Sequence, residues 1–448
     1  MVTGFPIHDG SPVVYPGPPP KQTDVVVLGG GIMGVMTAWH LAERGLRVVV
    51  CEKGRVAGEQ SSRNWGWIRQ QGRDLAELPI MMESLALWRT MAEEMPRLGF
   101  QSHGTMFLAR DHGEMFGFEA WMTQARGHGL DVRLQSSTQV YGRYDRASVQ
   151  WVGGLFTESD AQAEPWVAVP LLAAGAVRRG AVIVEQCAVR RLDVAAGRVV
   201  GVVTERGSIA CDQVVVAGGA WSSLFLRAEG VNIPQLSVMA SVARTEPMAA
   251  AFQGCMADDR IGLRRRADGG YTIAAGVLHD YFIGPDAFRN LGPNLSALKR
   301  DFKSTKFHLR APTDYPDGWG TVRHWSGDEV SPFERLRILN PKPNLKLLAK
   351  ALDDFATAFP DLGRPEIRTA WAGMIDTIPD VVPVIDRVAA LPGLVIATGL
   401  CGHGFGIGPG MGRVVADLVA GRPTGHDLTR FRLSRFSDGS KMVPGPSL

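Results

Sequence analysis

Short, fully apolar runs alternate with helix-patterned segments along much of the chain. Runs of this kind occupy residues 25–28, 48–51, 181–184 and 214–217, and a similar run at 394–398 ends on a threonine. A run of four or five apolar residues bounded by turn residues is typical of a strand that is buried on both faces of a sheet. Because these runs come from distant parts of the chain, they predict one α/β sheet that is discontinuous in sequence.

A different pattern fills residues 236–364. Residues 261–276 predict two antiparallel strands joined across an Asp-Gly-Gly turn at 268–270, because these residue types suit a hairpin. Helical patterns follow at 294–303 and 344–358. We therefore predict a second, α+β domain that is built on an antiparallel sheet and inserted into the first domain.

The remaining segments complete the predicted organisation. Residues 104–154 carry short strand and turn patterns, and residues 1–23 hold six prolines without periodicity, which predicts a surface arm. The predicted parts are the arm, residues 1–23; a first domain, residues 24–100, 150–235 and 365–430; a second domain, residues 101–149 and 236–364; and a C-terminal tail, residues 431–448.

The first apolar run leads into a glycine-rich turn. Gly29, Gly31 and Gly34 form G-x-G-x-x-G, and the second run ends on Glu52. In a strand-helix-strand unit these glycines allow a tight turn, a close approach to a pyrophosphate and close helix packing, while the acid accepts hydrogen bonds from a ribose. The unit predicts dinucleotide binding at a helix N-terminus, with NAD and FAD both open.

Composition and charge exclude several classes of function. The net charge is +3 over 448 residues, and the basic residues are dispersed apart from a cluster at 264–266, so no nucleic-acid partner is indicated. The five cysteines show no metal-ligand spacing, which predicts free thiols, no metal and a cytoplasmic location. No apolar run reaches the roughly 18 residues of a membrane span.

A long polar loop follows Glu52. Residues 54–74 are rich in Gly, Ser, Arg, Asn and Gln, and they include Trp65 and Trp67. Long ordered loops are usually functional, and a solvated loop seldom carries two indoles beside several arginines. The loop is therefore a candidate binding segment, with a plain surface loop as the alternative.

Five blocks resemble the D-amino-acid oxidase family of FAD enzymes, which includes glycine oxidase, monomeric sarcosine oxidase and D-amino-acid dehydrogenases. The blocks are the glycine motif with Glu52, residues 61–64, residues 214–221, residues 371–386 and residues 399–418. Residues 61–74 are most similar to members that act on cyclic or N-substituted amines, such as L-pipecolate oxidase and gamma-glutamylputrescine oxidase. The resemblance makes the first domain a Rossmann-like FAD-binding domain and the second a substrate-binding domain.

The resemblance implies non-covalent FAD. Gly373 stands where monomeric sarcosine oxidase has the cysteine that bonds to FAD. The residues implied to bind the cofactor are Gly29, Gly31, Ile32, Met33, Gly34, Glu52, Lys53, Ser61, Ser62, Arg63, Asn64, Trp65, Gly66, Val189, Gly218, Trp221, Gly373, Gly402, His403, Gly404, Phe405 and Gly406.

The implied reaction is oxidation of the C–N bond of an amino acid or a secondary or cyclic amine to the imine, by hydride transfer to flavin N5. Arg69 and Arg265 are candidates to hold a substrate carboxylate, with Tyr271 as a hydroxyl partner and His403 as a further catalytic candidate. The alternatives are a solvated surface position for each arginine and a backbone role for His403. Ala274 stands where sarcosine oxidases carry a lysine that helps oxygen react, so oxygen and another electron acceptor both stay open.

Two other classes of function remain as alternatives. An NAD-dependent dehydrogenase would use the same glycine motif, but the second glycine-rich loop at residues 399–412 favours a flavin. A flavoprotein subunit of a multi-chain amine dehydrogenase would transfer electrons together with partner chains. The expected partner of the enzyme itself is a small amine or amino acid, and a homo-oligomer is left open.

Overall fold

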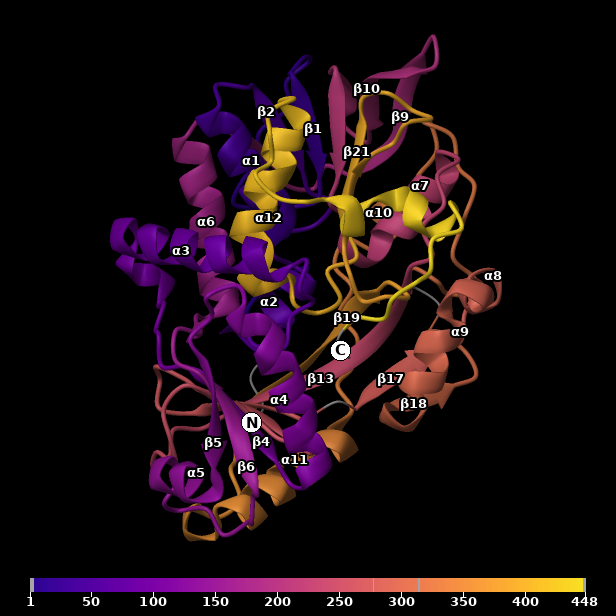
Figure 1. The fold of residues 1–448 in the computed structure, drawn as a ribbon. Helices are drawn as coiled ribbons and strands as arrows, with labels where there is room; N and C mark the ends of the chain where they lie inside the picture. The colour runs from indigo at the N-terminus through magenta and orange to yellow at the C-terminus, as the bar shows by residue number, and fades with distance from the viewer. Residues whose placement is uncertain (1–3, 277, 313–314, 446–448) are drawn as a thin grey trace.

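The computed structural model describes residues 4–276, 278–312 and 315–445. The first three residues of the predicted arm and the last three of the predicted tail lie outside these ranges. Two large sheets organise the described chain, one in the upper half of Figure 1 around β1, β2 and β21, and one in the lower half around β13, β4 and β6. This mixed α/β architecture confirms the predicted fold class.

The first sheet has the strand order β20-β21-β12-β1-β2-β8. Every residue of β1 and β2 is buried, and β1 runs parallel to both of its neighbours. Helices cover one face of the sheet, and a small antiparallel sheet at residues 189–210 together with residues 220–226 covers the other, which explains why these strands are apolar throughout. The strands are β1 (Val25–Leu28), β2 (Val48–Cys51), β8 (Val182–Val184), β12 (Gln213–Val216), β20 (Val384–Arg387) and β21 (Leu394–Thr398).

Glycines allow three helices of this domain to pack closely. A Cβ on Gly412 would lie 2.6 Å from the backbone carbon of Met36 in α1, and a Cβ on Gly410 would lie 2.5 Å from the Ile80 carbonyl oxygen in α3. Helix α12 therefore fits between α1 and α3 because these positions lack side chains. The helices of this half are α1 (Ile32–Glu43), α2 (Gln60–Arg63), α3 (Leu78–Glu94), α6 (Pro165–Arg178), α7 (Ser222–Ala228), α10 (Pro332–Arg335) and α12 (Gly404–Val419).

The larger sheet has the order β18-β17-β13-β16-β15-β14-β4-β6-β5, with β19 also paired to β13. The predicted hairpin is present, because β15 pairs antiparallel with β16 and Arg265 lies opposite Tyr271. The strands are β4 (Thr105–Ala109), β5 (Val132–Ser136), β6 (Gly153–Thr157), β13 (Leu236–Thr245), β14 (Cys255–Ala257), β15 (Gly262–Arg265), β16 (Tyr271–Ala274), β17 (His279–Phe282), β18 (Thr305–His308) and β19 (Ile367–Thr377).

The division into domains stays a prediction, and two strands bear on where its boundaries lie. Strands β6 and β19 belong to ranges predicted for the first domain, yet their hydrogen bonds are with β4, β5 and β13 of the larger sheet. These pairings join strands that are far apart in the sequence, as in the register that places Leu236 opposite Thr377. The local pattern of residues therefore does not reveal them. Two small sheets complete the strands: β9 (Val189–Ala195) with β10 (Arg198–Thr204) and β11 (Gly207–Ala210), and β3 (Trp67–Ile68) with β7 (Ala161–Gln162).

Three helices differ from the sequence-based expectation. Helices α4 and α5, of 15 and 7 residues, lie in the segment predicted as strands and turns, and α12 begins at Gly404, inside the predicted loop. In α4 only Met122 and Ala125 are buried, so its apolar periodicity is weak. The remaining helices are α4 (His112–Arg126), α5 (Ser137–Arg143), α8 (Pro285–Arg289), α9 (Leu291–Arg300) and α11 (Leu345–Ala358).

None of the helices in the described part of the chain combines the length and the apolar content that a bilayer crossing requires.

Candidate active site

A cavity of about 360 Å³ lies where the carboxyl ends of β1, β2 and β12 face the larger sheet. In open α/β sheets this edge is where ligands bind. The N-termini of α1 and α12 both open onto the cavity. The sequence-predicted residues that line it are Gly29, Gly31, Ile32, Met33, Glu52, Lys53, Ser61, Arg63, Asn64, Trp65, Arg69, Val189, Gly218, Trp221, Gly373, Gly402, His403, Gly404 and Phe405.

The glycine-rich turn leaves no room for side chains. Gly29 has φ +105°, and a Cβ there would lie 2.5 Å from the Ala217 carbonyl oxygen. A Cβ on Gly31 would lie 2.9 Å from Ser61 Oγ. The backbone between β1 and α1 is therefore the wall of the cavity, and a ligand can approach its N–H groups directly.

Glu52 closes one end of this turn. Its carboxylate accepts hydrogen bonds from the backbone N–H of Gly30 at 2.7 Å and of Gly54 at 2.6 Å. Burial raises the pKa of Glu52 to about 7, against the lowering effects of the Lys53 charge and of these hydrogen bonds. The carboxylate is thus fixed in place at the end of β2 and faces the cavity.

This raised pKa predicts a pH-dependent stability of the cofactor-free protein. The folded state holds the Glu52 proton more tightly than the unfolded chain does, so unfolding becomes easier as the pH rises from 4.5, the ordinary pKa, to about 7. We expect the free energy of unfolding of the parent protein, minus that of the Glu52→Gln variant, to fall by about 3 kcal/mol over this interval. Urea unfolding of both FAD-free proteins at several pH values measures the difference; parallel profiles would contradict it.

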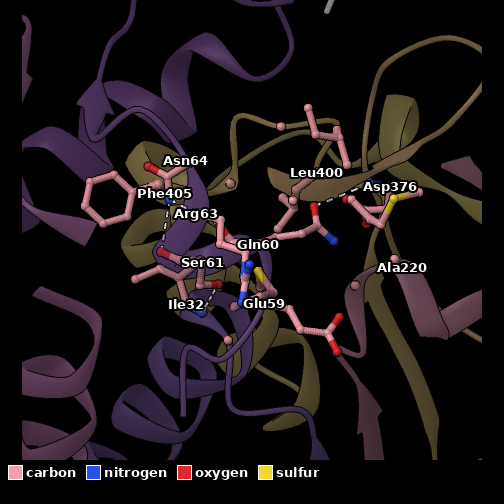
Figure 2. A pocket seen from close by; sticks show the side chains of 18 of the residues that line it. Ile32, Glu59, Gln60, Ser61, Arg63, Asn64, Ala220, Asp376, Leu400 and Phe405 are labelled. Atoms are coloured by element: carbon pink, nitrogen blue, oxygen red, sulfur yellow. Dashed lines mark hydrogen bonds between the residues drawn. The ribbon is translucent and has the colours of Figure 1, made fainter. Parts of the chain in front are cut away.

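Ser61 and Asn64 hold residues 61–66 in place beside the N-terminus of α1. Ser61 Oγ accepts a hydrogen bond from the Ile32 N–H at 2.8 Å, at the first residue of the helix. Asn64 Oδ1 accepts from the Gly66 N–H at 2.8 Å, and Asn64 Nδ2 donates to the Ser61 carbonyl oxygen at 2.9 Å. Figure 2 shows Ser61, Asn64 and Phe405 on one side of the cavity and Asp376 with Ala220 on the other.

Gln60, which the sequence did not single out, bridges these two sides. In the orientation that satisfies its amide, Nε2 donates to Asp376 Oδ1 at 2.9 Å and Oε1 accepts from the Ala220 N–H at 3.2 Å. Asp376 also accepts from the Gly399 N–H at 2.8 Å. The amide therefore links α2 to β19 and to the turn before α7 (Figure 2). A single glutamine in a polar loop gives no sequence signal for this role.

His403 stands at the N-cap of α12 and contacts Glu77. The ring Nδ1 lies 3.1 Å from the Cys401 carbonyl oxygen, and Nε2 lies 3.0 Å from Glu77 Oε2. Because a carbonyl only accepts, Nδ1 carries the proton in its contact with Cys401, and Nε2 faces the Glu77 carboxylate. Burial lowers the pKa of His403, while the Glu77 charge opposes this effect.

Four residues predicted to bind the cofactor do not line the cavity and contact protein atoms instead. A Cβ on Gly34 would collide with the Gly29 carbonyl oxygen, and one on Gly66 would lie 2.8 Å from the Arg264 guanidinium carbon. Ser62 Oγ donates to the Glu59 carbonyl oxygen at 3.2 Å. The Gly406 carbonyl oxygen accepts from Ser84 and Trp88 in α3.

Arg63 and Gly373 meet at one wall of the cavity. Arg63 donates to the Ala372 carbonyl oxygen at 2.9 Å and stacks 4.6 Å from the ring centre of Phe5 in the N-terminal arm. Burial lowers the pKa of Arg63 to about 10. A Cβ on Gly373 would lie 3.1 Å from Arg63 Cβ, so any side chain in the middle of β19 would press on this arginine.

The other end of the cavity carries two arginines. Arg69 is half-buried, lies 5.2 Å from the ring centre of Phe107 and donates Nη1 to the Gln71 carbonyl oxygen. Arg73, which the sequence did not single out, is 3% exposed and donates to the carbonyl oxygens of Arg69 and His403. Burial lowers the pKa of Arg69, and it lowers that of Arg73 to about 9.

Neither guanidinium forms a salt bridge with any residue in the described ranges. The buried carboxylates of Glu77 and Asp160 act on both guanidinium groups through space and raise their pKa values against the effect of burial, without a direct ion pair. Two guanidinium groups without a contacting carboxylate in a partly apolar cavity can bind an anionic ligand. Aromatic rings surround them, because Trp65 packs edge-on against Trp67 at 5.2 Å and Phe107 lies 6.2 Å from Trp67. This end of the cavity can thus hold a carboxylate next to an apolar group.

Arg265 and Tyr271 lie away from the cavity. Tyr271 is fully buried and its hydroxyl accepts from the Ala251 N–H at 2.7 Å, among the side chains between the larger sheet and α11. Arg265 lies 4.8 Å from the Tyr271 ring centre and donates to the Met248 carbonyl oxygen. The two are paired across β15 and β16, so both point to the face opposite the cavity.

Comparisons with known proteins agree with this geometry. Residues 24–418 match the family model described as "FAD dependent oxidoreductase" (DAO). The structure of the L-amino acid deaminase from Proteus myxofaciens in complex with anthranilate superposes with a TM-score of 0.90 and 32% identity, covering 96% of this chain and 97% of that chain.

Two curated relatives are more distant. Sarcosine oxidase subunit beta from Rhizobium meliloti is 25% identical over 95% of this chain and 90% of its own length. Mouse mitochondrial sarcosine dehydrogenase is 28% identical over 53% of this chain, and the match spans only 27% of that longer protein. The family match confirms the resemblance drawn from the five sequence blocks, and the chain belongs to the FAD dependent oxidoreductase family.

Proposed function

We propose that the chain oxidises the C–N bond of an amino acid or a secondary or cyclic amine to the imine. The observation that carries the proposal is one continuous cavity, which joins a dinucleotide-type end at the α1 N-terminus to an end that carries aromatic rings and two arginines without a direct salt bridge to any described residue. The known relatives support the same class, since their names include a sarcosine dehydrogenase and an L-amino acid deaminase.

The residues of the first end fit FAD. Gly29 and Gly31 lack the side chains that would keep a pyrophosphate away, and the α1 N-terminus supplies N–H groups and a positive dipole end. Glu52 offers a carboxylate to a ribose. We expect FAD to be held without a covalent bond, because Gly373 offers no nucleophile. The bound flavin supplies the hydride acceptor for the reaction.

The N-terminus of α12 has a separate task. Gly402, His403, Gly404 and Phe405 line the cavity, and no side chain caps the first N–H groups of this helix. Negative charge is stabilised at such a position. We infer that this helix end stabilises the charge that develops when the flavin is reduced.

Arg69 is the residue that we expect to hold the substrate carboxylate. Both arginines line the cavity, but Arg73 is 3% exposed and donates to two backbone carbonyl oxygens, whereas Arg69 is half-buried and donates to one. The planar guanidinium of Arg69 can donate two parallel hydrogen bonds to a carboxylate. Trp65, Trp67 and Phe107 then exclude water around the reacting carbon and favour an apolar side chain or ring.

The relative bound to anthranilate supports this choice of ligand chemistry. Anthranilate combines a carboxylate, an amino group and an aromatic ring, and the chain shares 32% identity with that protein over nearly its whole length. Glycine and proline could pair their carboxylate with Arg69, but they are too small to fill the space between the aromatic rings of the cavity. We therefore expect amino acids with larger apolar side chains to be better substrates than glycine.

An anaerobic substrate panel tests the proposed function. The holoenzyme is mixed without oxygen with D- and L-amino acids, pipecolate, proline, sarcosine and gamma-glutamyl amines, and flavin absorbance is followed. We expect one class to bleach the flavin, and the rate of recolouring in air then separates oxygen from another electron acceptor. A yellow protein that no compound bleaches would overturn the proposal.

A second function is favoured by one relative. The chain aligns over 95% of its length with a protein named as a subunit of sarcosine oxidase, so a flavoprotein subunit of a multi-chain enzyme is the alternative. In that case electrons would leave through a partner chain. Gel filtration of the protein from its native source, with identification of co-eluting chains, distinguishes a lone enzyme or homo-oligomer from such a complex. The cytoplasmic location stays a prediction.

A further inference from the structure

Exposed apolar side chains gather in one part of the second half of the chain. Isolated exposed apolar residues are ordinary, but contiguous ones mark a binding surface. Six large ones lie within a short stretch, and two of them, Phe302 and Leu309, are 62% and 90% exposed. They are Phe288, Leu291, Leu295, Phe302, Leu309 and Trp319.

These side chains lie on neighbouring elements. Figure 1 shows α8, α9 and β18 together at the right edge of the molecule, on the far side from α3 and α6. Leu291 and Leu295 are four residues apart in α9, so they share one face of the helix, and that face points to solvent. The ring centre of Phe288 in α8 lies 6.1 Å from that of Trp319.

Unpaired cations surround this apolar surface. Four exposed basic side chains form no salt bridge with a residue in the described ranges: Lys299, Lys303, Lys306 and Arg310. The described acids between 285 and 319 are already paired: Asp286 with Arg227 and Arg289, Asp301 with Arg300, and Asp317 with Arg323. The net charge of +3 does not reveal this local excess of positive charge, because acidic and basic residues nearly balance in the rest of the chain.

We propose that this apolar–basic face, made of the six apolar and four basic residues named above, binds the surface of a membrane that contains anionic lipids. Short amphipathic helices with Leu, Phe and Trp on one side and Lys or Arg beside them lie in the membrane interface. The lysine stems pack along the apolar groups while their ammonium groups reach lipid phosphates. No spanning helix is required for such binding.

The positive charge of the apolar–basic face favours an anionic membrane surface over a second copy of the chain as its binding partner. A two-fold dimer through this face would place the same patch on both sides and bring its unpaired cations together. Like charges across an interface oppose association. An anionic lipid surface instead neutralises them, and it accepts the apolar side chains between its headgroups.

Vesicle sedimentation with the holoenzyme tests the proposal. We expect the protein to sediment with vesicles of phosphatidylcholine and phosphatidylglycerol in equal parts, and to remain in the supernatant with phosphatidylcholine alone. Raising the salt concentration should weaken the binding, because the lipid–lysine attraction is screened. Failure to sediment with the anionic vesicles at low salt would overturn the proposal.

Paired variants identify the face. Lys303→Gln with Lys306→Gln should weaken vesicle binding about 30-fold, since each cation at an anionic surface contributes about 1 kcal/mol. Leu295→Ser with Phe302→Ser should also weaken it, by at least about 10-fold. The matched controls are Lys346→Gln with Lys350→Gln on α11, and Phe116→Ser on α4, which are exposed elsewhere.

The outcomes are distinct. Loss of binding in both face variants, with flavin content and the controls unchanged, supports the membrane surface. Equal loss in the control variants would show that binding does not use this face. A dimer in gel filtration that the Leu295→Ser and Phe302→Ser variant converts to a monomer, without vesicle binding by the parent, would assign the face to a second copy.

Discussion

Replacing Arg69 by methionine should lower kcat/KM for an amino-acid substrate by about 30- to 5,000-fold, since leaving a carboxylate without its buried partner costs roughly 2–5 kcal/mol. Methionine retains much of the side-chain volume, so the aromatic wall around Phe107 should remain in place. Flavin content should stay normal, because Arg69 lies at the end of the cavity away from Glu52. Steady-state kinetics with the best substrate of the anaerobic panel measures the effect.

Arg265→Met is the matched control. The two arginines were equal candidates from sequence, but Arg265 points to the opposite face of the larger sheet, where it lies over the Tyr271 ring. We expect this variant to keep kcat/KM within about threefold, as is usual for positions that do not contact the substrate. A large loss in Arg265→Met with little change in Arg69→Met would reverse the assignment.

Replacing Gly34 by alanine should abolish cofactor binding. The added Cβ would collide with the carbonyl oxygen of Gly29, and it would also lie 3.2 Å from a methyl carbon of Val27, so α1 would have to move away from β1. Overpacking of this kind costs about 1–3 kcal/mol of stability. We expect a colourless protein with a lower thermal midpoint, measured by absorbance and by thermal unfolding.

Gly117→Ala separates this collision from a general effect of losing a glycine. Gly117 lies inside α4, and a Cβ there would contact no atom within 4 Å. Alanine is favoured over glycine inside a helix by about 1 kcal/mol, so this variant should be slightly stabilised and yellow. If Gly34→Ala binds FAD like the parent protein, the close approach of α1 to β1 is not needed for the cofactor.

The dinucleotide-type end was predictable because its constraints are local. Gly29, Gly31 and Glu52 belong to one continuous strand-helix-strand unit, and each residue type follows from a backbone angle or a hydrogen bond made within it. The apolar runs likewise identified five of the six strands of the first sheet, because a strand that is buried on both faces is apolar along its whole length. The edge strand β20 (Val384–Arg387) ends on two charged residues and gave no such signal. The hairpin at β15 and β16 was found from its turn residues, which are again a local signal.

Long-range packing determined what the sequence could not reveal. Arg265 and Tyr271 were on the predicted strands, but the face that each presents depends on how β15 and β16 dock against α11. The glycines at residues 404–409 indicated a loop before a helix from residue 410, yet α12 already begins at Gly404, and its bare surface at Gly410 and Gly412 packs against α3 and α1. Arg73 became visible as a cavity residue only when α12 placed the His403 carbonyl oxygen beside it.

The most direct test of the central claim compares an amino acid with the amine that lacks only its carboxylate. Both are added anaerobically to the FAD-loaded parent protein, and the rate of flavin bleaching is followed as a function of concentration. The account predicts efficient bleaching by the amino acid and at least about 100-fold weaker action of the amine, because Arg69 would be left without its anion. Equal bleaching by both compounds, or by neither, would contradict it.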